Sequence, residues 1–284
     1  MKPFIAALLA VPALASAQPA DPQPEELLQI VFPKWADEEG GRVVSIPTST
    51  VTRGWDTRQG KQRKVAIVPR QVVRVAPDRL VLLAAMTPVG ESGDLQVSHG
   101  TPIGLSAYTF KPGKDGWQVA RRQEPFDLQG FEGRVQMDVV PLPAAPHALH
   151  VSWGSCWQGH CVDLFALYAI GMDGVQAQPL VLQKIKGGNV YSRPDCVDRL
   201  GGLLPGLAPP DGADEKVPPG KCYAVEGRWE ISGGGALTIR FKGAMSTASK
   251  QANEPARRVD QVMKFEFRGG RYVPVSGSNP VPDA

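Results

Sequence analysis

Four cysteines are the residues best suited to chemistry in this 284-residue chain, because a thiolate is both a nucleophile and a metal ligand. They are Cys156, Cys161, Cys196 and Cys222. An even number of cysteines favours disulfides over free thiols wherever a chain folds in an oxidising compartment. Three pairings are possible. We expect Cys156–Cys161 and Cys196–Cys222, since each pair is adjacent in sequence and closes a loop rich in turn residues.

One of these cysteines lies in a motif with a catalytic precedent. Residues 154–157 read Gly-Ser-Cys-Trp, which resembles the nucleophile motif of papain-like cysteine proteases and would imply a reactive Cys156 at a helix start. The resemblance covers these residues only. The oxyanion glutamine of that family lies upstream of the cysteine, whereas Gln158 lies downstream, and no histidine follows His160. Because the neighbouring residues also alternate as in a strand, we expect a disulfide-closed hairpin tip instead of a protease site.

Histidine spacing does not predict a metal site. The chain has four histidines, His99, His147, His150 and His160. His147 and His150 are three residues apart in an expected strand, so their side chains point to opposite faces. His150, His160 and Asp163 converge only if the loop between the first two cysteines folds back over its own hairpin. We therefore expect neither a metal nor a cofactor.

The sequence patterns of other catalytic classes are missing. There is no Gly-x-Ser-x-Gly nucleophile elbow, and the glycine runs lack the Lys-Ser/Thr that completes a phosphate loop. No Asp-x-Asp-x-Asp-Gly calcium loop is present either. A glycosidase pair of carboxylates need not be close in sequence. An envelope hydrolase with dispersed carboxylates is therefore kept as an alternative.

A basic stretch is the first of two candidate binding surfaces. Residues 53–74 contain seven basic side chains and a single acid. Within them, Arg58, Arg63 and Lys64 are the candidates for contact with an anionic partner, such as cell-envelope phosphate or an acidic protein surface. The alternative is a solvated edge strand whose charges prevent association with other sheets.

The second candidate surface is the loop around the first disulfide. It carries Trp153, Trp157, Gln158 and His160. Tryptophans held beside a small disulfide ring would make a rigid anchor for a protein partner, because little side-chain entropy is lost on binding. The alternative is that one or both tryptophans cover the hydrophobic core.

The N-terminus predicts where these cysteines are oxidised. Residues 1–17 have the three parts of a secretory signal peptide: Lys2 as the positive region, an apolar run over 4–14, and Ala-Ser-Ala over 15–17 as the cleavage pattern. The apolar run is shorter than the roughly 20 residues that cross a bilayer as a helix. No later stretch is long and apolar enough to span. We expect a mature chain that begins near Gln18 and folds in the periplasm or outside the cell.

The charge of the mature chain argues against a nucleic-acid partner. Without residues 1–17, 30 basic side chains stand against 28 acidic ones, a net charge of +2. Nucleic-acid binding usually requires a strong basic excess. The remaining length is sufficient for a substantial core.

The elements that must position all these residues are strands. From Val43 onward, short apolar and β-branched runs alternate with turn residues, consistent with the 27 prolines and 31 glycines of the chain. Three segments share the layout strand, Gly-containing tight turn, strand, at 104–119, 163–177 and 262–275. Two strand-like runs precede each segment, at 71–76 and 79–86, at 133–141 and 147–153, and at 222–231 and 235–242.

The sequence thus predicts an all-β fold of three repeated four-stranded antiparallel units, with a partial N-terminal unit from 43–52 and 64–69. Four-stranded units in series are typical of propeller blades, so we expect propeller-like packing, with a large β-sandwich or barrel as the alternative. One short N-terminal helix is expected over 25–32, where apolar residues have helical spacing and Pro33 ends the pattern.

The expected organisation has five parts. They are the signal peptide (1–17), a leader with the short helix (18–42), a β domain with the partial unit and units one and two (43–186), a Pro/Gly-rich crossing segment (187–221), and the third β unit of the same domain (222–284). We interpret the chain as an exported, non-catalytic binding protein of the periplasm or cell envelope, of inhibitor or immunity type, which recognises a protein partner. A small-ligand-binding or structural β module is the second alternative, beside the hydrolase.

Overall fold

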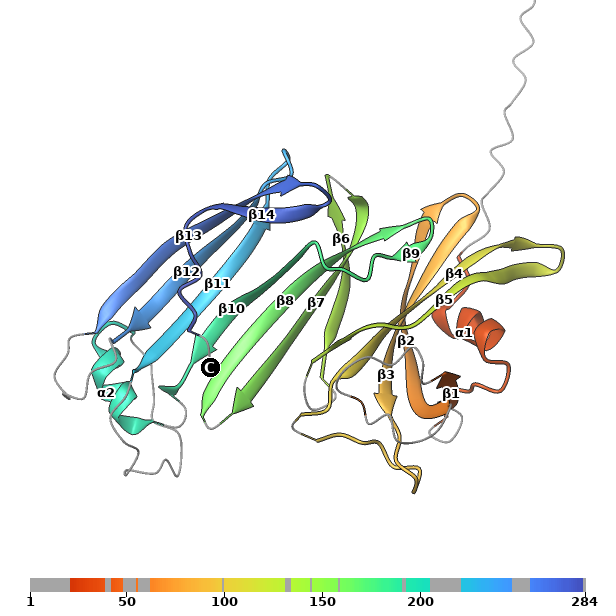
Figure 1. The fold of residues 1–284 in the computed structure, drawn as a ribbon, viewed down its shortest axis with the longest axis horizontal. Coiled ribbons are helices and arrows are strands. Elements are labelled where there is room, and N and C mark those ends of the chain that lie inside the picture. Colours follow the sequence, from red (N-terminus) through yellow and green to blue (C-terminus); the bar gives the residue numbers. More distant parts are fainter. Residues whose placement is uncertain are drawn as a thin grey trace, which may run out of the picture.

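The computed structural model describes residues 21–38, 42–47, 55, 62–98, 100–130, 134–143, 145–157, 159–190, 193–204, 221–246 and 256–282. Within these ranges the fold is all-β, with fourteen strands and two short helices (Figure 1). The helices are α1 (Pro24–Val31) and α2 (Pro194–Gly201). The strands are β1 (Val43–Pro47), β2 (Gln62–Ala76), β3 (Arg79–Pro88), β4 (Ile103–Gly113), β5 (Gly116–Gln129), β6 (Gln136–Leu142), β7 (Ala145–Trp157), β8 (His160–Gly171), β9 (Gly174–Val175), β10 (Val181–Gly188), β11 (Tyr223–Ile231), β12 (Leu237–Met245), β13 (Arg257–Arg268) and β14 (Arg271–Ser276).

The strands form two antiparallel sheets. Strands β1 to β5 make a five-stranded sheet in chain order. The remaining strands make a nine-stranded sheet in the order β14-β13-β12-β11-β10-β8-β7-β6, in which β9 also pairs with β8. In Figure 1 the nine-stranded sheet extends away from the five-stranded one, and α1 lies at the opposite end of the molecule from α2.

The three expected four-stranded units are confirmed as β2–β5, β6–β9 and β11–β14, each a series of antiparallel hairpins. A propeller is not shown. Strand β10, which the sequence analysis missed, pairs with both β8 and β11 and so joins the second and third units in one continuous sheet. The two antiparallel sheets, one of them curled like a half-barrel, are compatible with the alternative of a sandwich or barrel.

Two further differences and one agreement concern individual elements. The runs expected at 64–69 and 71–76 are one strand, β2, because a bulge between Pro69 and Gln71 lets the chain continue past the proline. The expected N-terminal helix is confirmed as α1, in which Pro24 occupies the first turn. A second helix, α2, lies inside the crossing segment and begins with Pro194 at its first position.

The core has layers on both faces of each sheet. On the face of the five-stranded sheet away from the other sheet, Leu27 and Leu28 of α1 pack with buried residues of β2, β3 and β4. Between the two sheets, Leu83 and Leu105 pack with Val151 and Tyr168. A third cluster, which includes Phe165, Tyr223 and Phe241, fills the other face of the nine-stranded sheet.

Polar contacts also join the two sheets. The Tyr168 hydroxyl donates to Asp127 Oδ2 at 2.6 Å, and burial raises the pKa of this tyrosine. Gln123 and Val175 exchange two hydrogen bonds: the side-chain amide donates to the carbonyl at 2.7 Å, and the backbone N–H donates to Oε1 at 2.9 Å. Since these bonds connect β5 with β8 and β9, they fix the nine-stranded sheet on the five-stranded one.

The contact between α1 and β5 contains a buried carboxyl group. Arg122 Nη2 donates to the carbonyl of Val31 at 2.5 Å, and its guanidinium lies 5.1 Å from the centre of the Phe32 ring. Glu124 is 6 % exposed, and its Oε1 lies 3.7 Å from Arg122 Nη1. Burial raises the pKa of Glu124 above its ordinary value of 4.5, and the attraction of Arg122 offsets only part of this effect.

Glu124→Gln is expected to stabilise the protein increasingly as the pH rises from 4 to 8. The folded protein holds the Glu124 proton more tightly than the unfolded chain does, so the stability that this group contributes is present below its ordinary pKa and is lost as the pH rises through the raised pKa. Urea denaturation at several pH values measures the difference. Glu266→Gln, which removes an exposed carboxylate, is the matched control. A difference between Glu124→Gln and the wild type that shrinks with pH would contradict the prediction.

Candidate binding groove

An open groove of about 870 Å³ lies on the nine-stranded sheet, at the ends of strands from its second and third units. It is lined by parts of β7, β8, β10, β11 and β12, and by two residues near α2. The lining contains both apolar and charged side chains. The volume is in the range of sites that hold a small molecule or a few residues of a peptide.

Small residues form the apolar part of the groove. The Cys156–Cys161 disulfide, which joins directly paired residues of β7 and β8, lies on one side. Ala224 and Gly243 lie on the other. Gly243 has φ of +155°, and a Cβ at this position would collide with the carbonyl oxygen of Ala224. A larger side chain is therefore not tolerated at Gly243, where β11 and β12 approach closely.

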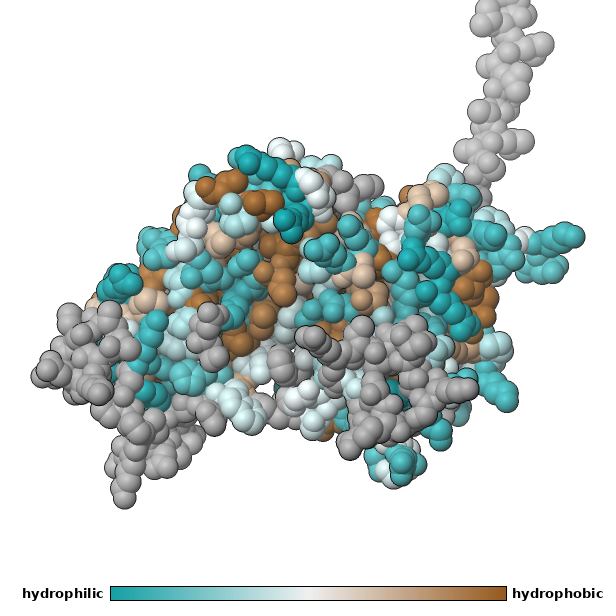
Figure 2. All heavy atoms as spheres, in the orientation of Figure 1, coloured by the Kyte–Doolittle hydropathy of each residue, from teal (hydrophilic) through white to brown (hydrophobic). Residues whose placement is uncertain are grey.

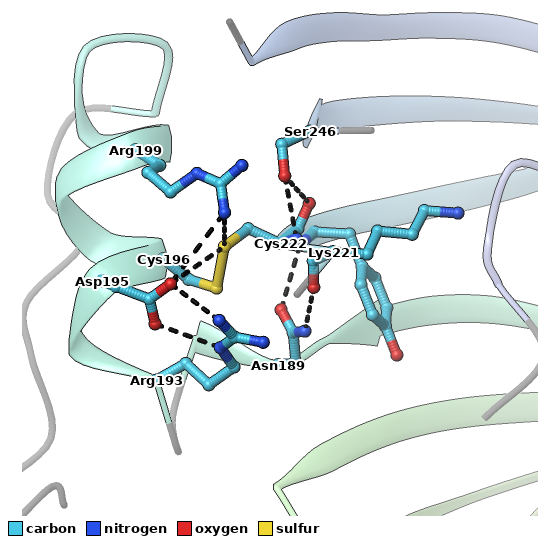
Figure 3. A network of polar contacts seen from close by, with 9 residues as sticks. Asn189, Arg193, Asp195, Cys196, Arg199, Lys221, Cys222 and Ser246 are labelled. Carbon is cyan, nitrogen blue, oxygen red and sulfur yellow. Dashed lines mark hydrogen bonds and ion pairs between the residues drawn. A yellow bond between two sulfur atoms is a disulfide. The ribbon is translucent and has the colours of Figure 1, made fainter. Parts of the chain in front are cut away.

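The end of the groove next to α2 is closed by Val190 and Leu204. Figure 3 shows how α2 is held there. The Cys196–Cys222 disulfide bonds the helix to the chain just before β11, and both sulfurs are buried. Arg193 donates from both Nε and Nη2 to the carboxylate of Asp195, at 3.0 and 2.7 Å.

The ends of β10 and β11 are held in register beside this disulfide. The side chain of Asn189 bridges two backbone groups: its Nδ2 donates to the carbonyl of Lys221 at 2.6 Å, and its Oδ1 accepts from the N–H of Tyr223 at 3.0 Å. The Oγ of Ser246 accepts from the N–H of Cys222 at 2.9 Å (Figure 3). The backbone N–H of Asn189 also donates to the carbonyl of Tyr223 at 3.1 Å, so the pairing continues one residue past β10 and fixes the position of Val190 in the groove wall.

Charged residues of alternating sign cross the sheet at the groove. The register places one charged residue from each of five neighbouring strands in a single row, in the order Asp163, Lys186, Glu226, Lys242 and Asp260. The first four line the groove. Lys186 Nζ lies 3.9 Å from Asp163 Oδ2. Oppositely charged cross-strand neighbours contribute about 0.2–1 kcal/mol each, so this row stabilises the sheet.

The next row breaks this pattern. Arg228 of β11 and Arg240 of β12 are directly paired, and both line the groove. Like charges in directly opposite positions destabilise a sheet. Each arginine has an acidic neighbour on β11. Arg228 Nε lies 3.9 Å from Glu226, and Arg240 Nη2 lies 3.1 Å from Glu230. With Lys186 and Lys242, the lining has four basic side chains and two acidic ones.

The carboxylates of the groove do not have the surroundings of a hydrolase pair. Asp163 and Glu226 are the acidic residues in its described lining, and each lies 3.9 Å from a basic side chain. Both are about half exposed or more. A general acid is typically buried among apolar side chains.

The structure divides the predicted tryptophan loop. Trp153 is 7 % exposed and belongs to the core between the sheets, so this tryptophan covers the hydrophobic core and is not available as an anchor for a partner. Trp157 is 63 % exposed, directly after the groove residue Cys156. His160 Nδ1 lies 3.2 Å from the hydroxyl of Tyr223, and the two rings are stacked. Gln158 lies outside the described residues.

Of the candidates in the predicted basic stretch, the structure describes Arg63 and Lys64 and places them in different environments. Arg63 is 2 % exposed, its Nη2 donates to Gln96 Oε1 at 3.0 Å, and its guanidinium lies 5.3 Å from the centre of the Trp55 ring. Lys64, by contrast, is exposed. Arg58 lies outside the described residues. An anionic partner at this stretch stays a prediction.

Both predicted disulfides are confirmed, as Cys156–Cys161 and Cys196–Cys222. The second pair lies close to Asp195, and these three residues have ligand atoms near enough for a metal ion. The two cysteines are bonded to each other, however, so their thiolates are not available as ligands.

The charged rows were missed in the sequence, although a signal for them was present. The alternation Glu-x-Arg-x-Glu over 226–230 and Arg-x-Lys over 240–242 marks the solvent face of two strands. What the sequence does not contain is the register that sets Arg228 opposite Arg240, or the intervening strand β10 that adds Lys186 to the row.

No family model, curated protein or solved structure matches this chain. Neither of the two eight-residue helices in the described part is long and apolar enough to cross a membrane. Two disulfides are compatible with an oxidising compartment outside the cytoplasm. The predicted signal peptide lies outside the described residues.

Proposed function

We propose that this chain is an exported, non-catalytic binding protein, and that the groove of the nine-stranded sheet binds an acidic segment of a partner protein. The observation that carries the proposal is the direct pairing of Arg228 with Arg240 at the groove. A sheet gains nothing in stability from two arginines in opposite positions. A carboxylate placed between them would be bound by two charge-assisted hydrogen bonds.

The apolar part of the groove suggests what accompanies that carboxylate. Val190, Leu204 and Ala224 lie at the α2 end, close enough to the charged rows to line the same groove. An aliphatic side chain of the partner would displace water from this part. The preferred segment therefore carries an aliphatic residue beside its acidic ones. Trp157 does not line the groove, and as the next residue of β7 after Cys156 it points to the opposite face, so it is left out of the proposed contact.

The proposal is tested with a fluorescein-labelled synthetic peptide in which glutamates flank a leucine. Fluorescence anisotropy with the purified chain is expected to show binding that weakens as the salt concentration rises. Arg228→Glu should weaken binding about tenfold or more, a loss of about 1.4 kcal/mol. The same substitution places a glutamate opposite Arg240 but removes the attraction between Arg228 and Glu226, so the free energy of unfolding should stay within about 1 kcal/mol of the wild type.

A large loss of binding with little change in stability separates a lost contact from a damaged fold. Lys111→Glu, at an exposed position on the five-stranded sheet, is the matched charge reversal and should leave binding unchanged. Equal binding by the wild type and Arg228→Glu would refute the proposed site. A peptide with lysines in place of the glutamates should not bind the wild type.

A further inference from the structure

The C-terminal segment 277–282 crosses one face of the nine-stranded sheet after β14 ends. Gly277 has φ of +76°, and a Cβ there would collide with the carbonyl oxygen of Val262, so glycine is needed where the chain turns away from β14. Figure 1 shows the segment passing in front of the sheet toward β10. Figure 2, in the same orientation, shows apolar surface over the middle of the sheet on the face that this segment crosses.

Two side chains attach the segment to the sheet. Asn279 Nδ2 donates to the carbonyl of Lys184 at 2.8 Å and to Gln183 Oε1 at 3.1 Å. Val281 is 6 % exposed and belongs to the core cluster of this face. It fits against Gly187, where an added Cβ would lie 2.5 Å from Val281 Cγ1. The sheet therefore presents a site for one amide and one aliphatic side chain, two residues apart.

The segment is bound as a peptide would be, and not as a strand of the sheet. It has no regular secondary structure. Pro280 and Pro282 have no backbone N–H to donate, so they cannot pair with a neighbouring strand. The contact back from the sheet is also made by a side chain: Lys184 Nζ donates to the carbonyl of Pro282 at 3.2 Å.

We propose that this face of β10 and β11 is a peptide-binding cleft that the chain's own C-terminal segment occupies as a removable strap. The occupant that replaces the strap is an extended segment of a partner protein with the same chemistry: a carboxamide side chain two residues before a β-branched aliphatic one, with prolines alongside. Gly187 lines both this cleft and the groove, but none of the described strap residues lines the groove, so the two proposals are tested separately, with different peptides.

The test uses a labelled peptide of the strap sequence, Gly-Ser-Asn-Pro-Val-Pro, added to full-length variants. In Val281→Asp the strap is expected to leave the cleft, because a carboxylate cannot remain in the apolar site. The peptide should then bind this variant. Its affinity for the wild type should be lower by about tenfold or more, since the attached strap competes at a high effective concentration. Fluorescence anisotropy measures both.

Two glycine variants identify the cleft as the place of binding. In Val281→Asp/Gly187→Ala the added methyl group fills the position of the valine, and the peptide should no longer bind. In Val281→Asp/Gly188→Ala the new Cβ makes ordinary contacts of 3.5 Å with Tyr223 O and 3.8 Å with Ala224 Cα, so binding should be retained. A circular dichroism spectrum confirms that each variant is folded. Absence of binding to Val281→Asp, or equal binding to the Gly187→Ala double variant, would overturn the proposal.

Discussion

Replacing Phe165 with Ala is expected to lower the free energy of unfolding by about 3–5 kcal/mol. The ring is fully buried, and it stacks on Trp229 with centroids 5.5 Å apart and planes 2° from parallel. His150 lies against both rings, at 6.1 Å from Phe165 and 5.1 Å from Trp229. Because Phe165 is on β8 and Trp229 on β11, this contact connects the second and third four-stranded units across β10. Its loss removes apolar burial and leaves a cavity where the two units meet.

Urea denaturation followed by far-ultraviolet circular dichroism measures the effect. Phe267→Ala is the matched control, because Phe267 packs on the same core but is only partly buried, near the tip of the β13–β14 hairpin. It should cost clearly less than Phe165→Ala. The free energy of unfolding of a typical domain is about 5–15 kcal/mol. A loss of the expected size should therefore also lower the midpoint of thermal unfolding markedly. Equal losses of unfolding free energy for the two variants would show that the contact between β8 and β11 contributes no more to stability than the partly buried Phe267 does.

Removal of the Cys196–Cys222 disulfide is the second large effect. The double variant Cys196→Ser/Cys222→Ser is expected to lose about 3.5 kcal/mol of stability, because the bond closes a long loop in the unfolded chain. The two cysteines are separated by 26 positions in sequence. The bond also holds α2 on the sheet, so its loss should loosen the wall that Val190 and Leu204 give the groove and weaken binding of the acidic peptide.

The other disulfide provides the comparison. Cys156 and Cys161 are separated by only 5 positions, so Cys156→Ser/Cys161→Ser should lose about 2 kcal/mol. Guanidinium denaturation of the oxidised wild type and both variants gives the three values. A larger loss for the short loop than for the long one would contradict the loop-closure account.

The sequence was a good guide to local structure in this chain. Alternating apolar residues and Gly-containing turns correctly predicted the hairpins, since both signals arise within a few residues. The disulfide pairs followed from the same local reasoning. Strand β10 was missed because its apolar run, 180–182, is short, and the strand ends in Lys186-Gly187-Gly188, which looks like a loop in isolation. Without β10, the three units appeared separable, and a propeller was expected where the second and third units form one continuous sheet.

The candidate site was harder to predict because it depends on register between strands far apart in sequence. Trp153 and Trp157 are four residues apart in one strand, yet the structure buries the first between the sheets and exposes the second at the hairpin tip. Arg63 and Lys64 are neighbours, but strand alternation places only one of them in solvent. The pairing of Arg228 with Arg240 requires the β11–β12 register, which composition does not determine.

The most direct test of the central claim, that the groove selects an acidic segment through the paired arginines, is a charge exchange between protein and peptide. We expect the affinity of Arg228→Glu for the glutamate-leucine peptide to fall about tenfold or more. Its affinity for the matched lysine-leucine peptide should rise. Lys111→Glu should show neither change. A charge preference that stays the same in Arg228→Glu as in the wild type would contradict the account, because the peptide would then bind elsewhere on the surface.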